Sequence, residues 1–152
     1  MTQVASALEE LRKLEGTELG VGDWFEVTQD RINTFADATN DHQWIHVDEK
    51  AAKDGPFGTT IAHGYLTLSL IPGLGGGGNL PISGAKMGIN YGLDRVRFIS
   101  PVPVGSKVRA RRKLIEAKEV PGGLQMKVEV TVEIDGQNKP ACVAETLSRV
   151  MF

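Results

Sequence analysis

The stretch NDHQWIHVD, residues 40–48, concentrates side chains that could carry out acid–base chemistry. It holds two of the three histidines in the chain, His42 and His46, together with Asp41 and Asp48. A carboxylate and an imidazole that share one water molecule can polarise it from both sides, which typically accelerates each proton transfer by about 10²–10⁴-fold. With no helix expected between them, Asp41 and His46 could turn toward one point, and such a pair suits the addition of water to an activated double bond. Alternatively, Asp41 forms an Asx-turn and His46 is a packed core residue.

A second candidate element is IAHGYL, residues 61–66, which contains the third histidine, His63. We expect this element at the start of a buried helix, where a glycine exposes its backbone N–H and the helix dipole favours negative charge. The Gly64 N–H could then stabilise the enolate that forms as water adds to an unsaturated thioester. Alternatively, Gly64 only permits close packing of the helix against a sheet.

Two helices are predicted before this region. Apolar residues at helical spacing predict a peripheral amphipathic helix over residues 4–15, which Gly16 ends. After a short extended piece, DWFEV, Thr28 is expected to cap a helix that runs to Asn40. The acid–base stretch therefore begins where the second helix ends.

Two further helices are predicted after the acid–base stretch. Asp48 is expected to cap a short helix that Gly55 and Pro56 end. The segment TTIAHGYLTLSLIPGL, residues 59–74, is apolar almost all round, which predicts a central buried helix.

The C-terminal half changes to a period of two, which indicates strands with one buried face. Alternation is clearest over residues 124–135, and turn residues on both sides predict an antiparallel meander with 106–119 and 140–152. Residues 92–98 are expected to add another strand. The predicted fold class is therefore α+β, with an antiparallel sheet wrapped around a long central helix.

Bulk composition narrows the classes of protein. With 152 residues, of which 41% are hydrophobic and 24% charged, the chain should form a single globular domain over residues 1–152. A net charge of −2 provides no basic field, so no nucleic-acid partner is expected. The single cysteine, Cys142, fits a reducing compartment. Since neither a signal peptide nor a membrane span is visible, we predict a cytoplasmic protein with no membrane partner.

The sequence disfavours two other kinds of site. Asp41, His42, His46 and Asp48 offer ligands that suit zinc or iron, but Gln43 stands where the H-E-x-x-H pattern needs glutamate, so no metal is expected. The sequence GLGGGG, residues 73–78, formally satisfies the dinucleotide fingerprint. It follows a predicted helix and opens none, so we expect a flexible loop and no such cofactor.

Covalent catalysis is also disfavoured. Ser69 lies in no G-x-S-x-G elbow, and Cys142 falls within a predicted strand. Neither residue is therefore expected to act as a nucleophile.

Three segments in order carry a family resemblance: DHQWIH, FGTTIAHGYLTLSL and RFISPVPVGSKV. On these segments the chain resembles the MaoC-like (R)-specific enoyl-CoA hydratases, close to their NodN-like branch, over nearly all of residues 20–152. The resemblance implies the hot-dog fold, in which a sheet wraps a central helix, and a homodimer in which two sheets join edge to edge. The implied activity is reversible syn hydration of a trans-2-enoyl-CoA to an (R)-3-hydroxyacyl-CoA, without cofactor or metal.

By position, the resemblance implies that Asp41 and His46 activate the water and that the Gly64 N–H binds the thioester oxygen. The usual loop reads aspartate-x-asparagine-proline-x-histidine, whereas Gln43 and Trp44 occupy the middle positions here. Pro72 stands where some members place a serine late in the central helix.

Other residues are expected to contact an acyl-CoA or an acyl-carrier thioester. Candidates near the thioester and acyl group are His63, Gln43, Trp44, Phe57, Asn90 and Tyr91, although aromatic residues are more often plain core. Candidates for the phosphates of coenzyme A are Arg95, Arg97 and Lys107, and the alternative for the arginines is a solvated sheet face.

Two rival functions stay open on the same fold. In a thioesterase, an acid in a similar place directs water at the carbonyl carbon instead of the β-carbon. In a non-catalytic acyl-thioester binding module, Trp44 could fill the position of the water.

Overall fold

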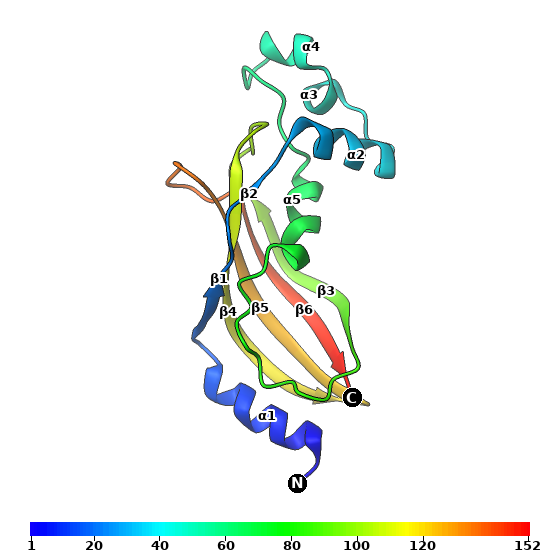
Figure 1. The fold of residues 1–152 in the computed structure, drawn as a ribbon, viewed down its shortest axis with the longest axis vertical. Coiled ribbons are helices and arrows are strands. Elements are labelled where there is room, and N and C mark those ends of the chain that lie inside the picture. Colours follow the sequence, from blue (N-terminus) through cyan, green and yellow to red (C-terminus); the bar gives the residue numbers. More distant parts are fainter.

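An antiparallel six-stranded sheet forms the body of the computed structural model, which describes residues 1–152 (Figure 1). The strand order is β1-β4-β5-β6-β3, and β2 also pairs with β4. The strands are β1 (Glu18–Val21), β2 (Phe25–Glu26), β3 (Met87–Phe98), β4 (Lys107–Val120), β5 (Gly123–Ile134) and β6 (Cys142–Met151). The predicted meander is confirmed as β4-β5-β6, whereas β3 begins earlier than predicted and β1 was not predicted.

The helices lie at both ends of the sheet and across it (Figure 1). They are α1 (Gln3–Leu14), α2 (Gln29–Thr39), α3 (Trp44–Val47), α4 (Glu49–Lys53), α5 (Gly64–Leu70) and the short 3₁₀ helix η1 (Ile71–Gly73). α1 packs against β4, and α2, α3 and α4 project beyond the opposite end of the sheet. None of these helices is long and apolar enough to span a bilayer.

The predicted helix caps are confirmed. The Thr28 hydroxyl accepts a hydrogen bond from the Arg31 N–H at 3.2 Å, and the Asp48 carboxylate accepts one from the Ala51 N–H at 2.9 Å. Asn40 ends α2 in the left-handed conformation, with a φ of 60°. These caps fix where the chain enters and leaves the segment of residues 40–48.

The central helix is shorter than the predicted span of 59–74, because the chain before Gly64 is extended. The Ile61 N–H donates to the Ile45 carbonyl at 3.1 Å, and the Ala62 N–H donates to the Val102 carbonyl at 2.8 Å. These long-range bonds take the place of helical ones. The expectation of a fully buried helix is also wrong for the single chain, since Tyr65 is 69% exposed.

The glycine loop of residues 73–78 opens no helix, as predicted, and leads through a turn region to β3. It is held against the sheet rather than free, because the Arg112 Nε donates to the Gly75 carbonyl at 2.7 Å. A Cβ on Gly22 of the segment after β1 would lie 2.0 Å from the Leu74 carbonyl oxygen. Only glycine allows this approach.

The hydrophobic core is one cluster of 24 buried residues, drawn mainly from α1, β4, β5 and β6. Leu11, Leu114, Leu124, Val130 and Val132 are fully buried within it. The sheet is therefore a rigid platform on which α5 and the projecting helices are mounted.

Candidate active site

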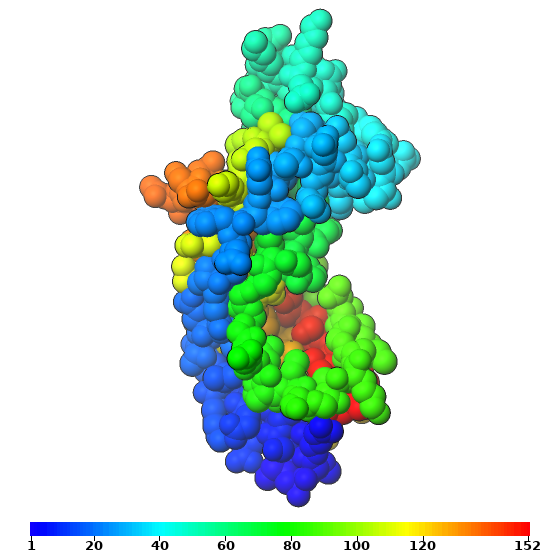
Figure 2. Space-filling model, in the orientation of Figure 1, coloured from blue at the N-terminus to red at the C-terminus, as the bar shows by residue number.

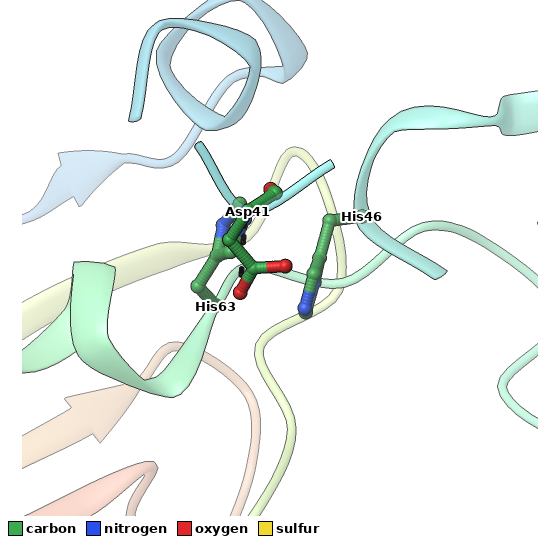
Figure 3. Close-up of side chains that lie close together, drawn as sticks. All are labelled: Asp41, His46 and His63. Atoms are coloured by element: carbon green, nitrogen blue, oxygen red, sulfur yellow. Dashed lines mark hydrogen bonds and ion pairs between the residues drawn. The ribbon is translucent and has the colours of Figure 1, made fainter. Parts of the chain in front are cut away.

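Asp41, His46 and His63 lie together at the N-terminal end of α5 (Figure 3). Each offers one polar side-chain atom, and these atoms all lie within 4.8 Å of one another. Asp41 comes from the loop after α2, His46 from α3, and His63 directly precedes α5. The structure therefore brings together the predicted acid–base pair with a histidine from a separate element.

The other members of the acid–base stretch point elsewhere. His42 Nε2 lies 2.8 Å from Asp37 Oδ1 on the surface. Asp48 is occupied as the cap of α4. The group that could hold a metal ion is thus Asp41, His46 and His63, rather than the set of Asp41, His42, His46 and Asp48.

Asp41 is held by its main chain while its carboxylate stays accessible. Its N–H donates to the Ala36 carbonyl at 3.1 Å, which continues the end of α2. The Gln43 N–H lies 3.4 Å from Asp41 Oδ1, a long Asx-type contact. Because the side chain is 50% exposed, the carboxylate remains available to a water molecule.

His46 is oriented by one main-chain bond. It lies in the short helix α3, contrary to the expectation of a loop, and only 7% of the residue is exposed. His46 Nδ1 lies 2.7 Å from the Ile61 carbonyl oxygen. Since a carbonyl can only accept, Nδ1 carries the proton and Nε2 keeps its lone pair.

Burial lowers the pKa of His46, and the neighbouring His63 lowers it further. The Ile61 carbonyl and Asp41 oppose this shift without cancelling it. At neutral pH the ring is therefore uncharged, which is the state that a general base requires.

His63 is buried next to Asp41 and His46 rather than exposed to solvent. It is 2% exposed, and its Nε2 donates to the Asp41 main-chain carbonyl at 2.9 Å. Its ring stacks on the His46 ring with 3.9 Å between centroids, and Phe35 contacts it at 4.9 Å. His63 Nδ1 is buried without a partner. This geometry makes His63 a residue that orients Asp41 and His46.

Gln29 is a site residue that the sequence reasoning missed. Its Nε2 donates to the His46 carbonyl at 2.8 Å, and its Oε1 accepts from the Thr60 hydroxyl at 2.6 Å. Gln29 therefore ties α3 to the extended segment before α5. A polar residue in the first turn of a helix is unremarkable in sequence, so no local signal could have identified it.

Gly64 is the first residue of α5 and follows His63 directly. A Cβ at this position would lie 3.0 Å from the Phe98 ring, which supports the alternative that Gly64 permits close packing. The same position leaves its N–H at the start of the helix, one residue after His63 of the cluster. Because α5 has only seven residues, any role for Gly64 rests on this N–H rather than on the helix dipole.

The remaining predicted residues are spread over several other places. Gln43 and Trp44 are exposed at the start of α3, and the Trp44 ring lies against Gly55, where a Cβ would be 3.0 Å away. Phe57 is 45% exposed in the turn after α4.

Asn90 and Tyr91 line a cavity at the other end of α5, together with Pro72. Arg95 and Arg97 line a separate recess that also contains Glu129 and Glu145. Lys107 opens β4 and pairs in register with Glu26 of β2. The structure therefore does not bring these residues to the Asp41 cluster.

A cavity of about 570 Å³ lies between the C-terminal half of α5, the glycine loop and the sheet (Figure 2). In Figure 2 it is the hollow bounded by the loop after α5 and by β3, with β6 visible inside. It shares no residue with the Asp41 cluster. The Asp41 cluster and this cavity thus occupy opposite ends of one short helix.

A curved antiparallel sheet around a central helix, with an aspartate and a histidine at the N-terminal end of that helix, is the hot-dog architecture of hydratases. Residues 11–138 match the family described as MaoC like domain, and the chain belongs to this family of MaoC-like dehydratases.

Curated relatives extend over almost the whole chain. The 3-hydroxyacyl-thioester dehydratase Z of Mycobacterium tuberculosis is 50% identical over 144 residues, covering 94% of this chain and 95% of that protein. Nodulation protein N of Rhizobium leguminosarum bv. viciae is 51% identical over 141 residues, covering 90% of this chain and 86% of that protein.

Solved structures show the same fold. The (R)-hydratase from A. caviae involved in PHA biosynthesis superposes with a TM-score of 0.68 at 26% identity, covering 86% of this chain and 96% of that one. Together with the family match, these relatives support a hydratase or dehydratase role for the chain.

Proposed function

We propose that the protein is an (R)-specific enoyl-CoA hydratase that catalyses reversible syn addition of water to a trans-2-enoyl-CoA. The observation that carries this proposal is the cluster of the accessible Asp41 carboxylate with His46 and His63, directly before Gly64 at the start of α5. The relatives named as a 3-hydroxyacyl-thioester dehydratase and an (R)-hydratase support it.

In the proposed reaction, Asp41 and His46 hold one water molecule between them. His46 Nε2 removes a proton as the water oxygen bonds to C3 of the enoyl group, and the Gly64 N–H stabilises the negative charge that develops on the thioester oxygen. The enolate then takes a proton at C2 from the same pair, so that H and OH are added to one face. The Asp41 carboxylate orients the water and stabilises the transient imidazolium.

No cofactor or metal takes part in this scheme, because water and the thioester supply every atom. The ligand atoms of Asp41, His46 and His63 are close enough to bind a divalent ion, and removal of metal tests whether such an ion takes part. Dialysis against EDTA is expected to leave the hydration rate unchanged. A rate that is lost and then restored by zinc would contradict the scheme.

The central test follows loss of the enoyl chromophore of crotonyl-CoA. Asp41→Asn and His46→Gln should each lower kcat by about 10²–10⁴-fold, because each removes one proton-transfer or orienting group. His42→Gln is the matched control, since His42 pairs with Asp37 outside the cluster. Unchanged rates in both site variants would refute the assigned roles.

The same experiment separates the rival functions. Release of the free CoA thiol would identify a thioesterase, and tight acyl-CoA binding without turnover would identify a binding module. The orientation of Trp44 disfavours the binding module, because the ring lies against Gly55 on the α4 side.

We also propose that two copies pair along β3, the strand at one of the two edges of the sheet. This strand exposes apolar side chains that a single chain leaves uncovered, namely Met87, Ile89, Tyr91, Leu93 and Phe98. Exposed apolar surface of this kind marks an interface. Sedimentation should show a dimer that Ile89→Lys weakens, and a stable, active wild-type monomer would overturn this assembly.

A further inference from the structure

The cavity beyond the C-terminal half of α5 is larger than a short acyl group needs. Leu68 and Ile71 line it, and they follow Gly64 by four and seven positions along the chain. At 1.5 Å per residue they lie roughly 6–10 Å further along the helix than Gly64. A thioester held at Gly64 would reach this cavity only with an acyl chain longer than a crotonyl group.

The walls of the cavity are mixed in chemistry. Most of the lining is apolar, which suits a hydrocarbon chain. Polar side chains gather on the same surface, and an alkyl terminus alone has no use for them. The apolar members include Leu68, Leu80, Leu93, Met126, Val128 and Leu147, and the polar members are Ser69, Asn90, Arg112, Thr146 and Ser148.

Arg112 is the single cationic residue of this lining. Its guanidinium donates only to main-chain carbonyls, from Nε to Gly75 and from Nη2 to Ile71. By contrast, the neighbouring Arg111 bonds the carboxylates of Glu18 and Glu133. Burial lowers the pKa of Arg112, so its positive charge is incompletely solvated.

Resting on the proposed hydratase function, we infer that this cavity is a second binding subsite for the distal end of the acyl group. In this subsite Arg112 binds a carboxylate at the chain terminus. The preferred substrates are therefore trans-2-enoyl thioesters of medium-length dicarboxylic acids. A guanidinium offers several N–H donors in a plane and forms charge-assisted hydrogen bonds to carboxylates. Ser69, Asn90 and Ser148 provide further polar contacts.

The test compares three substrates: crotonyl-CoA, trans-2-decenoyl-CoA and the decenoyl-CoA that carries a terminal carboxylate. The wild-type protein should show a kcat/KM for the carboxylate substrate about 10-fold or more above that for the methyl-ended one. Arg112→Met should lower the kcat/KM of the carboxylate substrate by about 10- to 100-fold, the value of a charge-assisted hydrogen bond. It should change the methyl-ended substrate far less. Arg111→Met is the matched control, since Arg111 pairs with carboxylates rather than lining the cavity.

Because Arg112→Met also removes the bonds to Ile71 of η1 and Gly75 of the glycine loop, a second variant is needed that leaves these bonds in place. Ser69→Phe narrows the cavity from an exposed helix position and leaves Arg112 intact. It should lower kcat/KM for both ten-carbon substrates relative to crotonyl-CoA. Equal kcat/KM for the methyl-ended and carboxylate substrates would overturn the inference, as would an equal loss on both in Arg112→Met.

Direct binding separates this inference from the hydratase proposal. Calorimetry would compare decanoyl-CoA with the CoA thioester of the ten-carbon dicarboxylic acid, neither of which can be hydrated. Tighter binding of the dicarboxylic thioester that is lost in Arg112→Met supports the subsite, even if no enoyl thioester is turned over. Equal binding of the two thioesters overturns it. Absence of hydration with all three enoyl substrates refutes the hydratase proposal alone.

Discussion

Replacing Gln29 by alanine should damage both stability and catalysis, although Gln29 touches neither the water nor the substrate. The side chain joins α2 to two parts of the site. It donates to the His46 carbonyl at 2.8 Å and accepts from the Thr60 hydroxyl at 2.6 Å. The direct bonds of Ile45 and His46 to Ile61 remain, so the loss of these two bonds loosens α3 against the segment that leads into α5 without detaching it.

The expected magnitude follows from the groups left behind. Thr60 is 1% exposed, so its hydroxyl loses its partner in a place that water does not reach easily. A lost hydrogen bond costs about 0.5–1.5 kcal/mol, and a buried group left unpaired costs about 1–3 kcal/mol. The free energy of unfolding should therefore fall by about 2–4 kcal/mol. A displacement of His46 by about 1 Å could lower kcat by about 10²-fold.

Urea unfolding and crotonyl-CoA hydration measure the two effects on the same preparation. Asn33→Ala is the matched control, because Asn33 bonds only the exposed side of the Gln29 amide. Gln29→Glu retains the acceptor for Thr60 but loses the donor to His46, so it should retain more stability than Gln29→Ala and still lose activity. Wild-type kcat in Gln29→Ala, at temperatures where that variant is folded, would refute the idea that Gln29 positions His46.

Three further predictions test other features. Burial holds the pKa of His46 below its ordinary value of 6.5, so the neutral ring contributes stability that is complete above pH 6.5 and is lost as the pH falls from there through the lowered pKa. The value of kcat/KM should decline over the same acidic range. A profile already falling above pH 7 on its acidic side would contradict this. Gly22→Ala should destabilise the fold by about 1–3 kcal/mol in urea, since the new Cβ meets the Leu74 carbonyl at 2.0 Å, whereas Gly73→Ala, which has open space, should have little effect on packing. Burial raises the pKa of the Cys142 thiol to about 11, so a thiol reagent at pH 8 should label it only in the unfolded protein; rapid labelling of the native chain would show that β6 opens.

Local patterns in the sequence predicted most of the regular structure. The alternation over residues 124–135 placed β5 within one residue at each end, and the capping residues Thr28 and Asp48 placed the starts of α2 and α4. These features depend on neighbours in the chain. By contrast, β1 has only four residues and includes Gly20, which disfavours a strand, so it forms because β4 offers it an edge.

The features that the sequence did not predict all depend on contacts between residues far apart in the chain. Thr59 to His63 was predicted as helix from its composition, yet pairing with Ile45 and Val102 holds that segment extended. The site shows the same limit. The spacing of Asp41 and His46 predicted an acid–base pair, but the stacking of His63 on His46 joins residues 17 positions apart. The bond between the Thr60 hydroxyl and Gln29 joins residues 31 positions apart, so no local sequence pattern predicts it.

The separation of the Asp41 cluster and the large cavity at opposite ends of α5 has an evolutionary consequence. Substitutions near Leu68 and Pro72 could retune which carbon skeletons are accepted while the machinery for proton movement stays untouched. Related proteins could therefore come to accept different acyl groups through changes in one short stretch of helix and the strands below it. For an engineer, a mutant library confined to that stretch would explore selectivity at little risk to turnover.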